Sequence, residues 1–391
     1  MPASDALAND LSALDPLFQP LTIRGMRLAN RFTMAPMTRS FCPGNLPGDD
    51  VVGYYRRRAE GGAGLVTTEA IGTDHPSAVG DTGLGEKDLP LFNGAPSVKA
   101  WGKVVEAVHA AGAKIVPQIW HQGPMRMPDG ISPAFSPSGH YGDIAKAPEY
   151  YADKARIIAA AEMPVPTDEE IADVVAGFGR AARDAMAAGF DGLALHGAHG
   201  YLIDSFLWAE TNRREQPWGG DAVQRTRFAV EVVKAVRAEL GEDKPLIFRF
   251  SQWKQQDFRG RLAETPQQLG EILGPIADAG VDLFDASVRY FNTPAFPEHG
   301  ELSLAGWAKK LTGKLTGAVG GIGFTKGMYD TMAAGSEGSN NLPLVLARFE
   351  AGEFDMVSIG RALLHDPHWI RKARAGEPLP PFDPASLERL T

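Results

Sequence analysis

The sequence predicts a (β/α)8 barrel, the TIM-barrel class, built as a single large domain. Short apolar or β-branched runs, each followed by a turn and an amphipathic stretch, recur about eight times along the 391 residues. Strands that alternate with helices imply a parallel sheet. No GxGxxG turn follows the first run, so an open dinucleotide-binding sheet is not favoured. Eight rounds then fit a closed barrel better than an open, doubly wound sheet.

The expected barrel strands are short, and a helix is expected after nearly every one. The strands are predicted at 31–36, 65–69, 114–119, 192–195, 246–250, 283–287, 315–319 and 356–359. The helices are predicted at 52–60, 98–111, 168–188, 223–240, 266–279, 304–311 and 342–351. Helix 168–188 has the clearest boundaries, because Thr167 can cap its start, Glu169 and Glu170 suit its positive end, and Gly189 follows it.

Three segments depart from this rhythm. Residues 1–16 are polar and Ala-rich, and we expect a flexible arm ahead of the barrel domain 17–391. Residues 122–166 hold a Pro-, Gly- and Ser-rich stretch that is too long for an ordinary loop, which predicts a capping excursion over the barrel mouth after the third strand. Decoration of the outer wall is the alternative. The loop 289–302 carries aromatic residues that either line a pocket or only pack.

Composition and charge exclude several classes of protein. With 44% hydrophobic residues, 22% charged residues and no low-complexity tract, the chain is an ordered globular one. The net charge is −9 and the sequence has no basic tract, so it predicts no positively charged surface for binding nucleic acid or an anionic membrane. The single Cys42 excludes an intrachain disulfide, a multi-cysteine zinc site and a cysteine-ligated iron–sulfur cluster. No signal-peptide or membrane-spanning run occurs, so we expect a cytoplasmic protein, and assembly into a homo-oligomer is left open.

The carboxyl ends of the predicted strands carry polar and glycine residues, and active sites of such barrels form there. These residues are Thr38, Ala70, Gln118, His196, His199, Tyr201, Arg249, Gly320, Gly321, Gly360 and Arg361. The glycine-marked turns after the last two strands are where these barrels commonly bind phosphate, although ordinary turns also contain such pairs. Arg249 lies in the apolar run LIFRF, so it needs an anionic ligand or a structural carboxylate beside it.

The segment LHGAHGYLIDSFL is the most informative in the chain. His196, His199 and Tyr201 lie within six positions across a glycine-bearing turn that leads into an apolar helix. Two neutral imidazoles can donate hydrogen bonds to one carbonyl oxygen, and a phenol can deliver a proton. A zinc site is the alternative, but no HExxH pattern or nearby cysteine completes a set of ligands.

Several motifs, in order, resemble those of the old yellow enzyme family of FMN-dependent ene-reductases. They are APMT, TEA, QIWHQG, HGAHGYLIDSFL, NRR, WGG, FRFS, AVGGIG and GRALLHDP. The resemblance covers almost the whole chain, and the set of motifs is far more specific than any one of them. It implies bound FMN, NAD(P)H as the reductant and an α,β-unsaturated carbonyl compound as the substrate, with no metal.

The resemblance also implies a role for each candidate residue. Arg249 and Gln118 would face the flavin N1 and C2 carbonyl, where negative charge develops on reduction. Thr38 and Ala70 would lie near the C4 carbonyl and N5, and Pro36 and Met37 near the ring edge. The turn residues Gly320, Gly321, Gly360 and Arg361 would hold the phosphate. His196 and His199 would bind the substrate carbonyl while Tyr201 protonates the α-carbon, in a ping-pong cycle.

Two alternatives stand beside this interpretation. One is a flavoprotein that acts physiologically on nitro compounds, quinones or ring amines. The other is a metal-dependent barrel hydrolase that uses His196 and His199, with His121 as a further candidate ligand. The chain departs from the family pattern at Thr38, where some members carry cysteine, and at SQWKQQDF after the fifth strand, where Trp253 can reshape the pocket.

Overall fold

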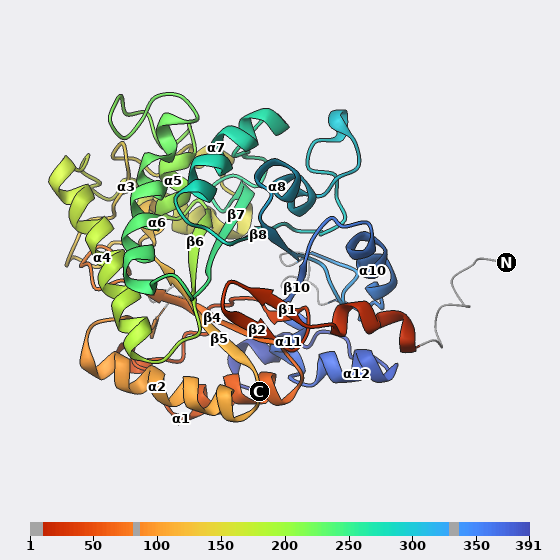
Figure 1. Cartoon of the computed structure of the whole chain (residues 1–391). Helices are drawn as coiled ribbons and strands as arrows, with labels where there is room; N and C mark the ends of the chain where they lie inside the picture. The colour runs from red at the N-terminus through yellow and green to blue at the C-terminus, as the bar shows by residue number, and fades with distance from the viewer. Residues whose placement is uncertain (1–10, 81–86, 328–335) are drawn as a thin grey trace.

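The computed structural model describes residues 11–80, 87–327 and 336–391, and its centre is a closed barrel (Figure 1). Parallel strands are hydrogen-bonded around the barrel in the order β10-β3-β4-β5-β6-β7-β8-β9. They are β3 (Phe32–Met34), β4 (Leu65–Gly72), β5 (Lys114–Trp120), β6 (Leu193–His199), β7 (Leu246–Lys254), β8 (Leu283–Ser287), β9 (Leu315–Val319) and β10 (Met356–Ile359). The predicted (β/α)8 class is therefore confirmed.

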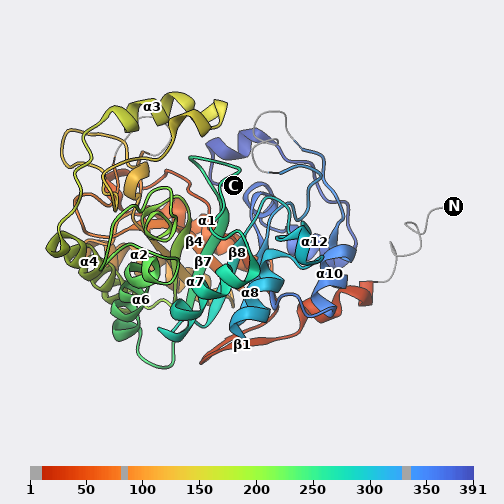
Figure 2. The same ribbon diagram turned by 90° about the horizontal axis from the view of Figure 1, so that it is seen from above.

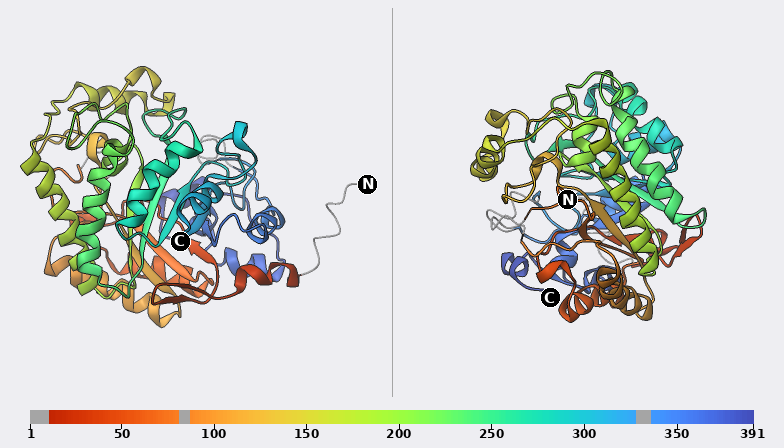
Figure 3. Two further views of the ribbon diagram at one scale, coloured as in Figure 1. Left: turned by 45° about the horizontal axis from the view of Figure 1, so that its top comes forward. Right: turned by 90° about the vertical axis from the view of Figure 1, so that its left-hand side faces the viewer.

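Helices follow the strands in chain order and cover the outside of the barrel (Figures 1 and 3). They are α1 (Asp49–Glu60), α2 (Ala95–Ala110), α3 (Ala152–Ala160), α4 (Asp168–Ala187), α5 (Leu202–Leu207), α6 (Arg227–Leu240), α7 (Pro266–Asp278), α8 (Leu304–Thr312), α10 (Leu342–Glu350), α11 (Arg361–His365) and α12 (Trp369–Ala375). Thr167 caps the start of α4, as predicted, and forms a capping box with Glu170. None of these helices is long and apolar enough to cross a bilayer.

An antiparallel hairpin closes the amino-terminal end of the barrel. Strands β1 (Leu21–Ile23) and β2 (Met26–Leu28) pair with each other, and their apolar side chains pack on those that fill the barrel interior, among them Leu65, Val116 and Ile247. Figure 2 shows β1 and α3 at opposite ends of the molecule. The hairpin was not predicted, because each of its strands has only three residues. It leaves the other end of the barrel as the open one.

The segments outside the barrel carry more structure than the sequence suggested. The 3-10 helix Leu11–Phe18 begins within the expected arm 1–16 and continues two residues past it, and residues 1–10 of that arm are outside the described part. It packs against α10 and α12. Within 122–166 there are three 3-10 turns and α3. In the loop 289–302, Phe291 and Phe296 are buried in the hydrophobic core, so these two rings pack and do not line the pocket described below.

Candidate active site

A cavity of about 400 Å³ lies at the carboxyl ends of the barrel strands, and every candidate site residue lines it. These are Pro36, Met37, Thr38, Ala70, Gln118, His196, His199, Tyr201, Arg249, Gly320, Gly321, Gly360 and Arg361. Tyr150 and Tyr151, from the segment 122–166, also line it. The size is typical of a site for a small molecule or a cofactor. The sequence therefore predicted which residues meet, while their roles remain predictions.

The two histidines and the tyrosine lie against one another. The ring centroid of His196 is 5.0 Å from that of His199 and 4.9 Å from that of Tyr201. The register between β6 and β7 shifts at Gly197–His199, and His199 has a φ of +65°. Such an irregularity re-aims side chains that a regular strand would point elsewhere, and strained backbone of this kind gathers at functional sites.

Both imidazoles are neutral at neutral pH. Burial lowers the pKa of His196 well below 6.5, and the Arg249 guanidinium lowers it further. Burial is also the first cause that lowers the pKa of His199, followed by the charges of His196, Arg249 and Lys254. A neutral imidazole has one N–H donor and one acceptor nitrogen. The pair can therefore donate hydrogen bonds to a ligand oxygen without carrying charge.

Arg249 has a carboxylate partner that the sequence did not reveal. Its Nη1 forms an ion pair with Asp285 of β8, and its Nη2 donates to Ser287 Oγ at 3.2 Å. Ser287 Oγ also lies 2.8 Å from His199 Nε2. Asp285, Ser287 and His199 are all buried or nearly so. The Ser287 hydroxyl therefore connects the Arg249 guanidinium to the His199 imidazole. A hydroxyl that accepts from Arg249 can donate its own proton to Nε2, which leaves the His199 proton on Nδ1.

Two donors on the cavity wall have no protein acceptor among the described residues. They are Gln118 Nε2 and Trp120 Nε1, both buried. A buried donor without an acceptor costs about 1–3 kcal/mol, so such a group needs an explanation. The Trp120 ring also packs edge-on against Tyr201, with centroids 4.6 Å apart. A bound molecule with acceptor atoms would satisfy these donors.

The turns with Gly320, Gly321 and Gly360 are predicted to bind phosphate, and local backbone geometry explains the first two glycines independently. Gly320 has a φ of +130°, and a Cβ there would lie 2.2 Å from the Val288 carbonyl oxygen. Gly321 has a φ of +68°. A Cβ at Gly360 would meet Met37 Sδ at 3.7 Å and the Ala35 Cβ at 4.0 Å, both ordinary contacts. Arg361 donates from Nη1 to the Gly327 carbonyl at 3.1 Å, so it holds a neighbouring loop.

The loop after β3 is fastened to a buried carboxyl on β4. Glu69 Oε2 accepts from the backbone N–H of Arg39 at 2.9 Å and from that of Ser40 at 3.4 Å. Burial raises the pKa of Glu69 to about 7, against the opposing effect of these two hydrogen bonds and of the Arg39 charge. Because Glu69 immediately precedes Ala70, its carboxyl positions the loop 36–38 beside the cavity.

Glu69 gives a pH-dependent contribution to stability. At a pH between 4.5, the ordinary pKa of a glutamate, and about 7, the pKa of Glu69 in the folded protein, the carboxyl is ionised in the unfolded state and protonated in the folded state. The unfolded state then binds fewer protons, so stability falls as pH rises through this window. From pH 5 to pH 8 we expect wild type to lose roughly 2 kcal/mol of unfolding free energy relative to Glu69→Gln. Urea unfolding of the wild-type and Glu69→Gln apoproteins measures this difference. The histidines contribute equally to both proteins, so their effect cancels. Parallel curves of unfolding free energy against pH would contradict the prediction.

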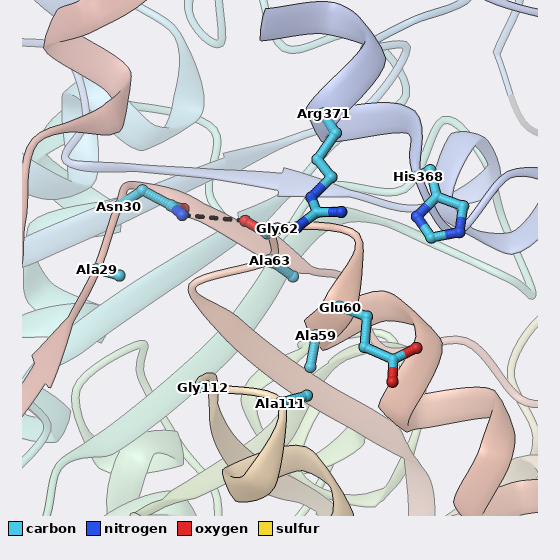
Figure 4. A pocket seen from close by; sticks show the side chains of 10 residues that line it. All are labelled: Ala29, Asn30, Ala59, Glu60, Gly62, Ala63, Ala111, Gly112, His368 and Arg371. Carbon is cyan, nitrogen blue, oxygen red and sulfur yellow. Dashed lines mark hydrogen bonds between the residues drawn. The ribbon is translucent and has the colours of Figure 1, made fainter.

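A second hollow, of about 600 Å³, lies at the opposite end of the barrel (Figure 4). Its lining residues immediately precede the strands, belong to α1 or α12, or cap the start of α12, and its ionisable side chains, Glu60, His368 and Arg371, are exposed. The Asn30 amide is bonded to the Gly62 carbonyl at 3.0 Å. No buried ionisable group lines this hollow, in contrast to the cavity at the other end of the barrel.

The metal-site alternative offered His121 as a further ligand beside His196 and His199. His121 does not line the cavity, and its Nε2 lies 3.0 Å from Ser77 Oγ. Within residues 11–80, 87–327 and 336–391, no group of three or more His, Cys, Asp or Glu side chains is placed to hold a metal ion. His121 therefore does not join His196 and His199 on the cavity wall.

Sequence reasoning missed the residues that support the site from neighbouring strands. Asp285, Ser287 and Gln255 were not candidates, although Ser287 and Gln255 line the cavity. Asp285 and Ser287 lie on β8, inside a predicted strand, and their separation from Arg249 in the chain hid the contact. The polar residue at the carboxyl end of that strand was the one signal that could have indicated Ser287.

Comparisons with known families, sequences and structures all find similarity to reductases and oxidoreductases. Residues 16–379 match the NADH:flavin oxidoreductase / NADH oxidase family. The chain is 31% identical over 380 residues to putative 12-oxophytodienoate reductase 13 of Oryza sativa subsp. japonica, covering 95% of this chain and 92% of that protein. It is 39% identical over 230 residues to putative 12-oxophytodienoate reductase 4 of the same organism, covering 58% of this chain and only 56% of that protein. The structure of morphinone reductase in complex with tetrahydroNAD superposes with a TM-score of 0.76 at 26% identity, covering 95% of this chain and 93% of that one.

Proposed function

Because the chain belongs to the old yellow enzyme family of NADH:flavin oxidoreductases, whose members bind FMN, we propose that it uses NAD(P)H to reduce activated C=C bonds in α,β-unsaturated carbonyl compounds. One observation carries the proposal. Two neutral imidazoles and a phenol, those of His196, His199 and Tyr201, converge on a cavity whose wall also carries Arg249. The similarity to proteins named as reductases supports the same class of chemistry.

The cavity wall fits FMN. Gln118 Nε2 is a buried donor without a partner among the described residues, and the Arg249 guanidinium is a fixed cation on the same wall. A pyrimidine carbonyl and the negative charge that reduction places near it would satisfy both groups. Gly320 and Gly321 bring backbone without side chains to the same cavity, which suits a phosphate. We expect Pro36, Met37, Thr38 and Ala70 to contact the ring.

The chain's own residues account for the polar steps. FMN, when bound, would supply the hydride for the β-carbon, with NAD(P)H as the reductant. His196 and His199 donate hydrogen bonds to the substrate carbonyl oxygen and so draw electron density from the alkene. Tyr201 transfers its phenolic proton to the α-carbon. Because nicotinamide and alkene would occupy the same cavity, we expect them to bind in turn, as in a ping-pong cycle.

An anaerobic absorbance titration tests the proposal. Protein reconstituted with FMN should lose its visible flavin band on addition of NADPH or NADH and regain it when 2-cyclohexenone is added. Bleaching without recovery by the enone would keep the flavoprotein but contradict reduction of simple enones. It would then favour nitro compounds, quinones or ring amines as substrates. Failure to bind FMN at all would contradict the whole proposal.

We expect Gly320→Ala to weaken FMN binding by about tenfold or more, since each 1.4 kcal/mol costs about that factor in affinity. The new Cβ would collide with the Val288 carbonyl oxygen at 2.2 Å and displace the turn. Gly313→Ala is the matched control, because Gly313 also has a left-handed φ, +68°, but nothing lies within 4 Å of its added Cβ. Fluorescence titration with FMN measures both affinities, and equal affinities would contradict a phosphate-binding role for this turn.

A further inference from the structure

The carboxyl end of β7 and the residues after it form hydrogen bonds and a stacking contact with the turn that carries His199 and Tyr201. We call residues 251–256, with the sequence SQWKQQ, the β7 clasp. Ser251 Oγ accepts from the His199 N–H at 3.0 Å, and the Gln256 side chain donates to the Gly200 carbonyl at 3.1 Å. Trp253 stacks on the His199 imidazole, with centroids 4.3 Å apart. This turn is therefore held by side chains of the neighbouring strand as well as by its own backbone.

A fully buried ion pair anchors the clasp. Lys254 Nζ lies 2.6 Å and 2.8 Å from the two carboxylate oxygens of Asp204 on α5, and neither side chain is exposed. Asp204 Oδ2 also accepts from the Gly200 N–H at 2.7 Å. A buried pair satisfied in this way tolerates little displacement, because each charge is costly without its partner. Residues on either side of Lys254 are consequently held in fixed places.

Gln255 is the clasp residue that bonds to the phenol oxygen. Its Nε2 donates to Tyr201 Oη at 2.8 Å, and Gln255 lines the cavity. An amide N–H is only a donor, so the phenol oxygen accepts and its own proton remains for another acceptor. The Tyr201 ring is fixed by its edge-on contact with Trp120 and is almost wholly buried. In a buried site, a donor aimed at an oxygen stabilises negative charge that develops there.

On the basis of the function proposed above, we propose that Gln255 is a positioning residue for proton transfer by Tyr201. As the hydride adds to the β-carbon, the Tyr201 O–H bond breaks, a C–H bond forms at the α-carbon, and the O–H electron pair stays on the phenolate oxygen. The Gln255 amide holds the phenol so that its proton points into the cavity, and it stabilises the phenolate. Solvent water then returns a proton to Tyr201.

Three substitutions separate this role from simple support of the turn. Gln255→Leu keeps the bulk but removes the donor, and should slow oxidation of the reduced enzyme by 2-cyclohexenone roughly tenfold, about the effect of one hydrogen bond to a charged group. Gln255→Glu places a carboxylate there that accepts the phenolic proton, so it should be slower still. Gln256→Leu is the comparator, since Gln256 grips the same turn through the Gly200 carbonyl and does not bond to Tyr201.

Stopped-flow spectroscopy measures both half-reactions, in H2O and in D2O. We expect Gln255→Leu to be reduced by NAD(P)H at the wild-type rate, while its enone half-reaction slows and its solvent isotope effect rises. Equal slowing of both half-reactions, or the same behaviour in Gln255→Leu and Gln256→Leu, would overturn the proposal. Gln267→Leu, on the outer helix α7, controls for the loss of a glutamine.

A measurement on the apoprotein keeps this test independent of the proposed function. In protein labelled with ¹³C at the tyrosine Cζ, the Tyr201 resonance is the one that disappears in Tyr201→Phe. Loss of the amide donor in Gln255→Leu should shift that resonance, whereas Gln256→Leu should leave it near its wild-type position. An unmoved resonance in Gln255→Leu would overturn the hydrogen bond itself. A shifted resonance in a protein that reduces no enone would instead contradict the proposed function.

Discussion

Tyr201→Phe is expected to slow the oxidation of the reduced enzyme by 2-cyclohexenone by about 100-fold or more, while its reduction by NAD(P)H proceeds at the wild-type rate. General acids typically contribute about 100-fold to 10,000-fold, and this substitution removes the acid, together with the hydrogen bond that its hydroxyl accepts from Gln255, while it keeps the ring. The phenyl ring keeps the contacts with Trp120 and His196 that position it. Only the half-reaction that needs a proton at carbon should therefore change.

Stopped-flow absorbance of each half-reaction separates the outcomes. Tyr141→Phe is the matched control, because the Tyr141 hydroxyl is buried, has no hydrogen-bond partner among the described residues, and does not line the cavity. It should leave both rates unchanged. If Tyr201→Phe slowed both half-reactions equally, Tyr201 would be acting on the cofactor or on the fold, and a different group would have to protonate the α-carbon.

The barrel was predictable because its signals are local. Each strand is a short apolar run beside a turn, and each helix has its own periodicity and caps, so residues a few positions apart specify them. The strand ends were harder to predict. β6 continues to His199 and β7 to Lys254, beyond the predicted ends at 195 and 250, because pairing between these two strands stabilises polar residues that have little strand propensity of their own.

The site was predictable to the extent that its residues lie at strand ends. His196, His199 and Tyr201 were recognised from their spacing, and the barrel topology then placed them beside Arg249. The supporting contacts were not predictable in this way. Ser287 is 88 positions from His199, and Gln255 is 54 positions from Tyr201, so no spacing pattern indicates either pair. The register of β6 against β7 and of β7 against β8 creates them.

Arg249→Met is expected to lower the unfolding free energy of the apoprotein by about 3 kcal/mol, because it leaves the Asp285 carboxylate buried without its cation. It should also weaken FMN binding and lower the reduction potential of the bound flavin. The guanidinium favours the extra negative charge of the reduced cofactor, and for a two-electron couple each 1.4 kcal/mol corresponds to about 30 mV. Urea unfolding and spectroelectrochemical titration measure the two effects.

The double variant Arg249→Met with Asp285→Asn separates the fold from the cofactor site. Removing both charges of a buried pair is often close to neutral, so most of the lost stability should return. The asparagine can still accept the hydrogen bond that Ser358 Oγ now makes to Asp285 Oδ1 at 3.4 Å. The flavin potential should nevertheless remain low, because no cation faces the cofactor. Recovery of the potential together with stability would show that Arg249 acts only through Asp285, and Arg249 would then lose its assigned place beside the flavin.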